Sequence, residues 1–183
     1  MLDEEALIDG CIRGDRATQR TLYEHFCRKM LVVSLRYSKG QQEAEDILQE
    51  SFIKVFDHIR HFRRDCPLEG WIRRIVVNTA LNHNRSKLYL YPALDLEEVE
   101  QAVAENVTLA GFHFEELLTM VQQLAPRYQV VFNLYAIEGY SHREIAELLD
   151  ISEGTSKSQF ARARVILQQM IAEKQKVNYE KFK

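Results

Sequence analysis

The sequence predicts an all-α protein built from two small helical domains that are joined by an acidic linker. Glycine and proline are scarce, with seven and three among 183 residues, and this scarcity favours long helices. No run of apolar–polar alternation is long enough to predict a strand. The segment 88–112 contains Pro92 and lacks helical periodicity. We therefore predict one domain over residues 1–87, the linker over 88–112 and a second domain over 113–183.

Apolar periodicity and helix start and stop signals predict eight helices. In the first domain, Gly14–Asp15 and Lys39–Gly40 mark the boundaries between helices. The helices expected in the first domain cover 3–12, 16–37, 42–60 and 67–86. Those expected in the second domain cover 113–124, 127–138, 142–150 and 153–172.

Charge is unevenly distributed along the chain. The formal net charge is −3, which by itself disfavours a nucleic-acid binder. Residues 60–87 nevertheless carry a balance of +5, and residues 154–172 contain three basic residues and no acid. Residues 88–118 contain seven acids and no Lys or Arg. The net charge of the whole chain therefore conceals two cationic segments that could contact nucleic acid.

The composition also argues against several classes of protein. The three cysteines are odd in number and form no C-x-x-C pair, so we expect a reducing cytoplasm rather than a disulfide framework. The acidic start, MLDEEALIDG, has no apolar run and predicts no signal peptide. No stretch of 18 apolar residues predicts a membrane span.

The strongest local pattern lies in residues 139–164, GYSHREIAELLDISEGTSKSQFARAR. Gly139 can close a helix in the left-handed conformation. Ser141 and Glu144 have the spacing of a capping box, and Ser152 can cap the following helix. Two closely spaced helices around a tight turn predict a helix-turn-helix. The expected apolar faces are Ile145, Ala146, Leu148 and Leu149 in the first helix and Ser156, Phe160, Ala163 and Leu167 in the second.

The second helix of this motif leaves a basic, polar surface outside its apolar stripe. Such a helix fits the major groove of B-DNA, which is about 12 Å wide. Lys and Arg can neutralise phosphates, and Gln can pair with a base edge. The alternative is a plain helical hairpin with a solvated basic face. The outward residues are Thr155, Lys157, Ser158, Gln159, Arg162 and Arg164.

Residues 43–56, EAEDILQESFIKVF, predict a helix with one apolar side. The inward residues are Ala44, Ile47, Leu48, Ser51, Phe52, Val55, Phe56 and Ile59. The opposite side is acidic and includes one apolar residue, which hints at a docking surface but is also common on solvated faces. That side consists of Asp46, Gln49, Glu50, Ile53 and Asp57.

Residues 60–87, RHFRRDCPLEGWIRRIVVNTALNHNRSK, combine a basic loop with a second amphipathic helix. The inward side of the helix is Leu68, Trp71, Ile72, Ile75, Val76 and Thr79. Arg74, Asn78 and Arg85 align on another side, and Phe62, Arg63 and Arg64 precede the helix. Basic residues with nearby aromatic rings suit single-stranded DNA, because bases stack and phosphates pair.

Taken together, these segments resemble the sigma factors of bacterial RNA polymerase. EAEDILQESFIKVF resembles the stretch that docks on the polymerase, and FRRDCPLEGWIRRIVVNTALNHNR resembles the promoter-melting helix. LAPRYQVVFNLYAIEGYSHREIAELLDISEGTSKSQFARAR resembles the C-terminal sigma helix-turn-helix. Their order, spacing and chain length resemble the extracytoplasmic-function (ECF) group. The two domains would then be a sigma region-2-like bundle and a sigma region-4-like helix-turn-helix.

The resemblance implies roles for the surface residues. Asp46, Gln49, Glu50 and Ile53 would dock on the β′ clamp helices of core RNA polymerase. Phe62, Arg63, Arg64, Arg74, Asn78, Asn82 and Arg85 would hold the melted minus-ten strand, with one base flipped into a loop pocket. Thr155, Lys157, Ser158, Gln159, Arg162 and Arg164 would read the minus-35 duplex.

The resemblance also implies partners and a location. The β flap of the polymerase is an expected second contact, and the acidic linker would thread the RNA exit path. An anti-sigma factor is a further expected partner, which could hold the cytoplasmic protein at the inner membrane. No cofactor and no catalytic or metal-binding residue is expected.

Three residues depart from the family pattern. Ser156 stands where Val is usual, so we expect the second helix of the motif to pack less tightly. Gln159 replaces a usual Arg or Lys, and Asn82 replaces a frequent Asp. These departures concern promoter choice.

Two other functions compete with this interpretation. A free-standing helix-turn-helix regulator would bind duplex DNA without polymerase, and it predicts a dimer and a palindromic site. A metal-dependent hydrolase would use ligands from His58, His61, Cys66 and His83, whose spacing is loose for zinc. No Gly-rich phosphate loop or nucleophile motif supports an enzyme.

Overall fold

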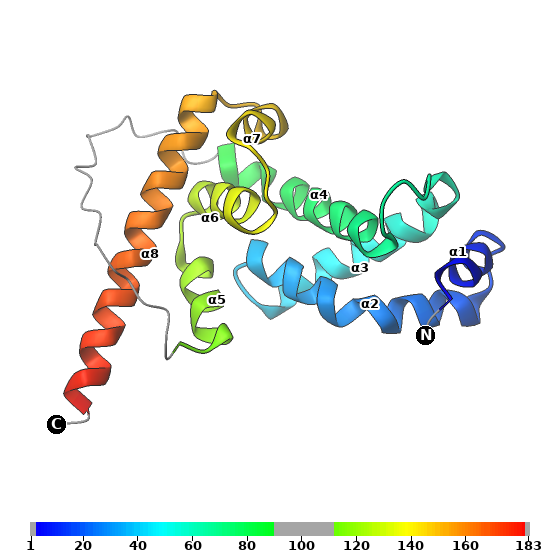
Figure 1. Ribbon diagram of the computed structural model, residues 1–183, viewed down its shortest axis with the longest axis horizontal. Coiled ribbons are helices and arrows are strands. Elements are labelled where there is room, and N and C mark those ends of the chain that lie inside the picture. The colour runs from blue at the N-terminus through cyan, green and yellow to red at the C-terminus, as the bar shows by residue number, and fades with distance from the viewer. Residues whose placement is uncertain (1–2, 90–111, 182–183) are drawn as a thin grey trace. The chain divides into compact units, whose positions relative to one another are not determined.

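Helices make up all the regular structure in the described part of the chain, which comprises residues 3–89 and 112–181 of a computed structural model (Figure 1). The chain divides into two compact units, residues 1–86 and 87–183. The first contains the sequence up to the end of the predicted basic helix, and the second contains the predicted helix-turn-helix. The predicted linker falls almost entirely outside the described residues.

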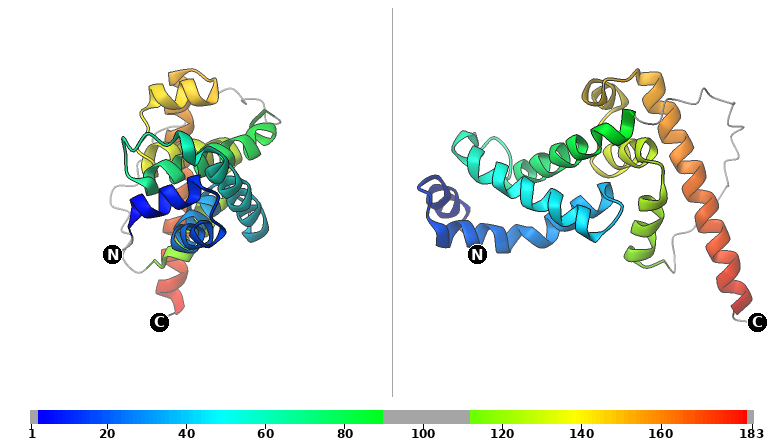
Figure 2. Two further views of the ribbon diagram at one scale, coloured as in Figure 1. Left: turned by 90° about the vertical axis from the view of Figure 1, so that its right-hand side faces the viewer. Right: turned by 180° about the vertical axis from the view of Figure 1, so that it is seen from behind.

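The described part of the first unit contains four α-helices and one 3₁₀ turn. They are α1 (Glu4–Ile12), α2 (Arg16–Tyr37), α3 (Gln41–His58), η1 (Ile59–His61) and α4 (Leu68–Tyr89). α2 and α3 run side by side (Figures 1 and 2). Capping fixes two of the starts: Asp3 accepts a hydrogen bond from the Ala6 amide at 3.2 Å, and Asp15 accepts one from the Thr18 amide at 2.9 Å.

The core of the first unit is the shared apolar side of α2, α3 and α4. Seven of the eight residues expected to point inward from α3 and η1 are buried, and Phe56 is half-buried. The end of α4 is tied to the end of α2, because the Asn84 side chain donates to the Tyr37 carbonyl at 2.8 Å. α1 approaches α2 closely at Gly10, where an added Cβ would lie 2.5 Å from Thr18.

The second unit holds the helix-turn-helix against two further helices. Its elements are α5 (Phe114–Gln123), α6 (Pro126–Phe132), the π turn η2 (Asn133–Ile137), α7 (His142–Leu149) and α8 (Glu153–Lys181). α5 and α6 lie beside α8 (Figure 1). The core joins Met120 of α5 and Leu124, which directly follows α5, to Ala163, Leu167 and Ile171 of α8. α8 runs nine residues past the predicted end at 172.

A pair of substitutions tests whether one side of α7 is buried and the other exposed. Ile145 is fully buried, so Ile145→Ala should lower the free energy of unfolding by about 2–5 kcal/mol. Leu148 is 41% exposed, so Leu148→Ala should cost under about 1 kcal/mol. Urea unfolding followed by circular dichroism gives both values. Fluorescence of Trp71, the single tryptophan, separately reports the first unit. Equal costs for the two variants would contradict the packing of α7.

Candidate functional surfaces

The outer face of α3 presents the four residues predicted to dock. Asp46, Gln49 and Glu50 are exposed, and Ile53 is 61% exposed. The opposite side of the helix is buried in the core. Lys54 pairs with Glu50 at 2.7 Å, so the face is not uniformly anionic. The structure thus brings these four residues together as one acidic surface with an apolar centre, called here the α3 surface.

The outer face of α4 carries four of the residues predicted to hold single-stranded DNA. Arg74, Asn78, Asn82 and Arg85 are all exposed and follow one another at spacings of four, four and three. The inward side is fully buried at Ile72 and Val76. This row, called here the α4 stripe, has two positive charges and two amides, which can contact phosphates and base edges.

Phe62, predicted to hold the minus-ten strand, is buried in the first unit. Its side chain is only 7% exposed and lies against Trp71, with ring centroids 5.1 Å apart. The loop precedes the N-terminal end of α4, and Phe62 in the loop and Leu68 at the start of α4 are both buried in the core. The ring therefore offers no face for a base to stack on. Arg63 remains exposed beside it.

Arg64 has contacts that the sequence did not suggest. Its Nε lies 3.0 Å from the Glu5 carboxylate, and its guanidinium donates to Asp9 at 2.9 Å. Its backbone is left-handed, at φ 59°, which is uncommon for a residue with a side chain. Arg64 thus fastens the loop to α1, and a phosphate would have to compete with two carboxylates. The i, i+4 spacing of Glu5 and Asp9 was the available signal for this contact.

The helix-turn-helix forms as predicted at its caps. The Ser141 hydroxyl accepts from the Glu144 amide at 3.2 Å, and the Glu144 carboxylate accepts from the Ser141 amide at 2.8 Å. The latter hydrogen bond is the main cause of a lowered pKa at Glu144. Gly139 is left-handed at φ 80°, and Ser152 caps α8 by accepting from the Thr155 amide at 2.9 Å.

One detail of α7 differs from the prediction. Ile145 is buried and Ala146 and Leu149 are half-buried, but Leu148 is exposed. α7 has only eight residues and packs against α8 and η2. Leu148 therefore belongs to the surface of the unit.

The six predicted DNA-reading residues of α8 fall into two groups. Thr155, Ser158, Gln159 and Arg162 share one face by their helical spacing, and Arg162 is exposed. Lys157 and Arg164 lie toward the other edge of the helix and are also exposed. Lys157 pairs with Glu153 at 2.7 Å. The first group suits the floor of a major groove, and the second suits the phosphates along its edge.

Ser156 occupies a fully buried position on α8. Its hydroxyl lies 2.9 Å from Nδ1 of His142 at the start of α7. The His142 ring stacks on Tyr135 of η2, with centroids 4.2 Å apart and planes 13° apart. The expectation of looser packing therefore overlooked a polar partner. A buried polar residue in an apolar stripe was the signal that a partner should exist.

The stability of the second unit should depend on the charge of His142. Partial burial lowers the pKa of its imidazole, the positive charge of Lys157 lowers it further, and Glu153 acts in the opposite direction. A lowered pKa in the folded state means that the unfolded chain binds more protons near its ordinary pKa of about 6.5. Stability is therefore lost as the pH falls through that value.

The non-titrating variant His142→Asn isolates this effect. Urea unfolding at pH 7.5 and pH 5.5 should show a larger loss of stability in the wild type than in His142→Asn. Other groups titrate equally in both proteins, so the difference between the two losses reports His142. An equal loss would contradict the lowered pKa.

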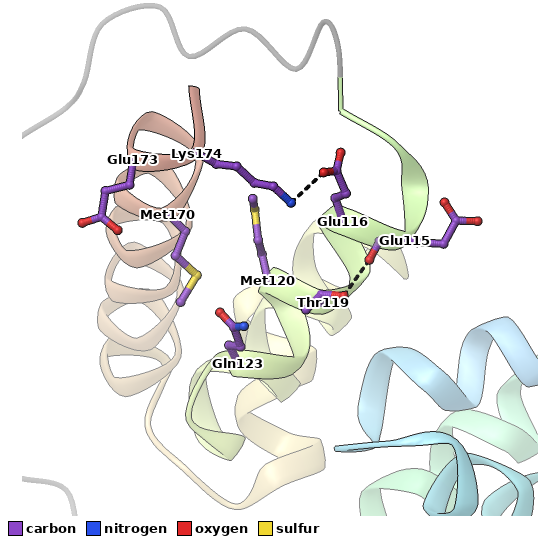
Figure 3. A pocket seen from close by; sticks show the side chains of 8 residues that line it. All are labelled: Glu115, Glu116, Thr119, Met120, Gln123, Met170, Glu173 and Lys174. Atoms are coloured by element: carbon purple, nitrogen blue, oxygen red, sulfur yellow. Dashed lines mark hydrogen bonds and ion pairs between the residues drawn. The ribbon is translucent and has the colours of Figure 1, made fainter. Parts of the chain in front are cut away.

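A groove of about 410 Å³ lies between α5 and the C-terminal part of α8 (Figure 3). Met120 and Met170 supply apolar surface, and Glu115, Glu116 and Glu173 supply three carboxylates. Lys174 reaches across and pairs with Glu116 at 2.6 Å. With three acids and one paired cation, the groove would repel DNA.

The residues considered as zinc ligands do not gather. The His58 and His61 rings are 6.3 Å apart, and residues 3–85 and 112–176 contain no group of three metal-ligating side chains. In the same described part of the chain, no helix is both long and apolar enough to cross a membrane.

Sequence comparisons match both units to known domain families. Residues 22–88 match Sigma-70 region 2, and residues 114–167 match Sigma-70, region 4. The RNA polymerase sigma-H factor of Pseudomonas aeruginosa is 29% identical over 88% of this chain and 90% of that protein. The ECF RNA polymerase sigma-E factor of Haemophilus influenzae is 28% identical over 93% of this chain and 96% of that protein.

Solved structures share the fold at lower identity. The sigma factor RpoE from Bartonella quintana, crystallised with the anti-sigma factor NepR, gives a TM-score of 0.51 at 18% identity, over 84% of this chain and 96% of that one. CnrH in complex with the cytosolic domain of CnrY gives 0.50 at 18% identity, over 92% of this chain and 96% of that one. The chain matches region 2 and then region 4 in order, and its relatives align with it along nearly their whole length. The chain therefore belongs to the sigma-70 family and is an RNA polymerase sigma factor of the ECF group.

Proposed function

We propose that this sigma factor divides promoter recognition among three surfaces on its two domains. The α3 surface docks on the β′ clamp helices, the α4 stripe holds the melted minus-ten strand, and the outer side of α8 reads the minus-35 duplex. The observation that carries the proposal is that each surface lies on the side of a helix opposite its buried core side, exposed on α3 and α4 and half-buried to exposed on α8. We propose domain limits of 1–87 and 113–183, with the linker between them.

Docking through the α3 surface draws on both charge and burial. Asp46 and Glu50 can pair with cations on the polymerase, and Ile53 supplies an apolar anchor that is 61% exposed in the free protein. Apolar residues at the centre of an interface, surrounded by polar ones, commonly supply much of the binding energy.

Minus-ten recognition is assigned to Arg63 and the α4 stripe. Two arginines can neutralise phosphates, while Asn78 and Asn82 can donate to and accept from bases that have left the duplex. Asn82 is uncharged where the family often has an acid, so it can approach a phosphate without repulsion. Arg64 takes part only if α1 releases it.

Minus-35 recognition is assigned to α8. Thr155, Ser158, Gln159 and Arg162 face the bases, and Lys157 and Arg164 contact the backbone. Gln159 suits adenine, because its amide can bond to N6 and N7 together. The base opposite Gln159 should therefore differ from the one chosen by relatives with Arg or Lys there.

Further partners follow from the function. The β flap is proposed as the contact of the second domain on the polymerase. An anti-sigma factor is proposed because two proteins with the same fold were solved in complexes. RpoE was solved with the anti-sigma factor NepR, and CnrH was solved with the cytosolic domain of CnrY. A sigma factor acts where the polymerase is, so we propose a cytoplasmic location, with the anti-sigma factor as a route to the membrane.

The test compares DNA binding by the purified chain with binding by the chain plus core RNA polymerase. A pool of random-sequence duplexes is offered to each, and the retained DNA is sequenced. We expect enrichment of a two-part sequence only with polymerase, because the DNA contacts are split over two small domains and the net charge is −3. Tight enrichment of a palindrome by the chain alone would overturn the proposal and favour a free-standing regulator.

A further inference from the structure

We infer that His142 is a positioning residue for minus-35 recognition, which seats the first turns of α8 through its hydrogen bond to Ser156. The inference rests on the proposed role of α8. His142 itself is not assigned a DNA contact. It acts on residues that are assigned such contacts, because Ser156 lies between Thr155 and Lys157 and three positions before Gln159.

The burial of Ser156 makes the hydrogen bond necessary. The residue is fully buried on the same inward stripe as Ala163 and Leu167, where a hydroxyl without a partner would be costly. The partner of that hydroxyl on the neighbouring helix is Nδ1 of His142, at 2.9 Å. A valine here would make apolar contacts that tolerate small rotations, whereas a hydrogen bond prefers one distance and direction.

The His142 ring is itself held in place by aromatic contacts. It stacks on Tyr135 of η2 at 4.2 Å, and Tyr135 in turn lies 4.4 Å from Phe160 of α8. The His142 and Phe160 rings are 5.8 Å apart. Residues of η2, α7 and α8 therefore meet around the His142 imidazole, and these aromatic contacts hold the ring in the orientation in which Nδ1 bonds to Ser156. This arrangement sets both the rotation of α8 about its axis and its position along that axis relative to α7.

The functional consequence follows from the geometry of base reading. A base pair is distinguished by hydrogen bonds that need the side chain within a few tenths of an ångström. The hydrogen bond to Ser156 lies within one helical turn of Thr155 and Gln159. Removing it should therefore change which bases these residues reach, beyond any loss of stability.

The test uses holoenzyme assembled from core RNA polymerase and the full chain. Its probes are the minus-35 duplex selected by the wild type and a copy with one substituted base pair opposite α8. The readout is the dissociation constant for the substituted duplex divided by that for the selected duplex, and this ratio does not depend on how much of the protein is folded. His142→Leu should weaken binding to the selected duplex about tenfold and lower the ratio. His142→Asn, whose amide can reach Ser156, should recover much of the ratio.

Two further variants separate positioning from packing. His142→Leu/Ser156→Val removes the buried hydroxyl along with its partner, so it should regain thermal stability while its base preference stays different from the wild type. Glu147→Leu, an exposed change in the same helix, should leave the ratio unchanged. A ratio that stays at the wild-type value in both His142→Leu and the double variant would overturn the inference. A wild-type holoenzyme with no minus-35 preference would overturn the proposed role of α8 as well.

Discussion

Replacing Asp46 and Glu50 with arginine should abolish stable binding to core RNA polymerase while leaving the chain folded. Both side chains are exposed, so the core of the first unit is untouched. The change reverses two charges of the α3 surface, and it leaves Lys54 beside a new positive charge instead of its present partner Glu50. Like charges facing each other across an interface cost several kcal/mol, so the dissociation constant should rise at least about a hundredfold. Titration of fluorescently labelled protein with core enzyme measures it.

The matched control carries the same change in charge at other exposed acids. Glu4→Arg/Glu173→Arg alters one exposed residue in each unit, in α1 and α8 rather than in α3. It should bind core enzyme within about threefold of the wild type. If both double variants lose binding equally, net charge rather than the α3 surface controls assembly, and the docking assignment is wrong.

Replacing Arg74 and Arg85 with glutamate should preserve binding to core enzyme but block promoter opening. Both arginines lie on the exposed α4 stripe, and carboxylates there would repel the phosphates of a melted strand. The fraction of open complexes should fall at least about tenfold, because each lost phosphate contact costs roughly 1 kcal/mol and the new repulsion adds to it. Permanganate reactivity of unpaired thymines measures the open fraction.

The control for this variant is Arg16→Glu/Arg28→Glu. These arginines are exposed on α2 of the same unit, so the change in net charge is identical. This control should open promoters as the wild type does. Normal opening by the α4 variant would show that another surface holds the melted strand.

The sequence was sufficient for the features that depend on neighbouring residues. The capping box at Ser141 and Glu144, the left-handed Gly139 and the buried side of α3 each follow from spacings of two to four residues. The exposed faces of α3, α4 and α8 follow from the same periodicity. For this reason the residue pattern alone predicts most members of the candidate surfaces.

Features that depend on distant residues could not be predicted. The ion pairs of Arg64 with α1 join residues 55 or more positions apart, and Phe62 is buried in the core although it lies in the loop before α4. Beyond the predicted end of α8 at 172, Lys174 pairs with Glu116 of α5, a residue 58 positions away in the sequence. The contact between His142 and Ser156 spans 14 positions and needs both helices in place. The spacing of Glu5 and Asp9 and the polar Ser156 within an apolar stripe indicate that partners exist, but no spacing in the sequence identifies which residues they are.

The most direct test of the account is to ask which DNA each unit touches in one complex. A photo-crosslinking residue is placed at Asn78 or at Ser158 in holoenzyme bound to a promoter, and the crosslinked bases are mapped. We predict that position 78 crosslinks to the single-stranded minus-ten region and that position 158 crosslinks to the minus-35 duplex. Crosslinks from both positions to the same element, or from position 158 to melted DNA, would contradict the division of promoter recognition between the two domains.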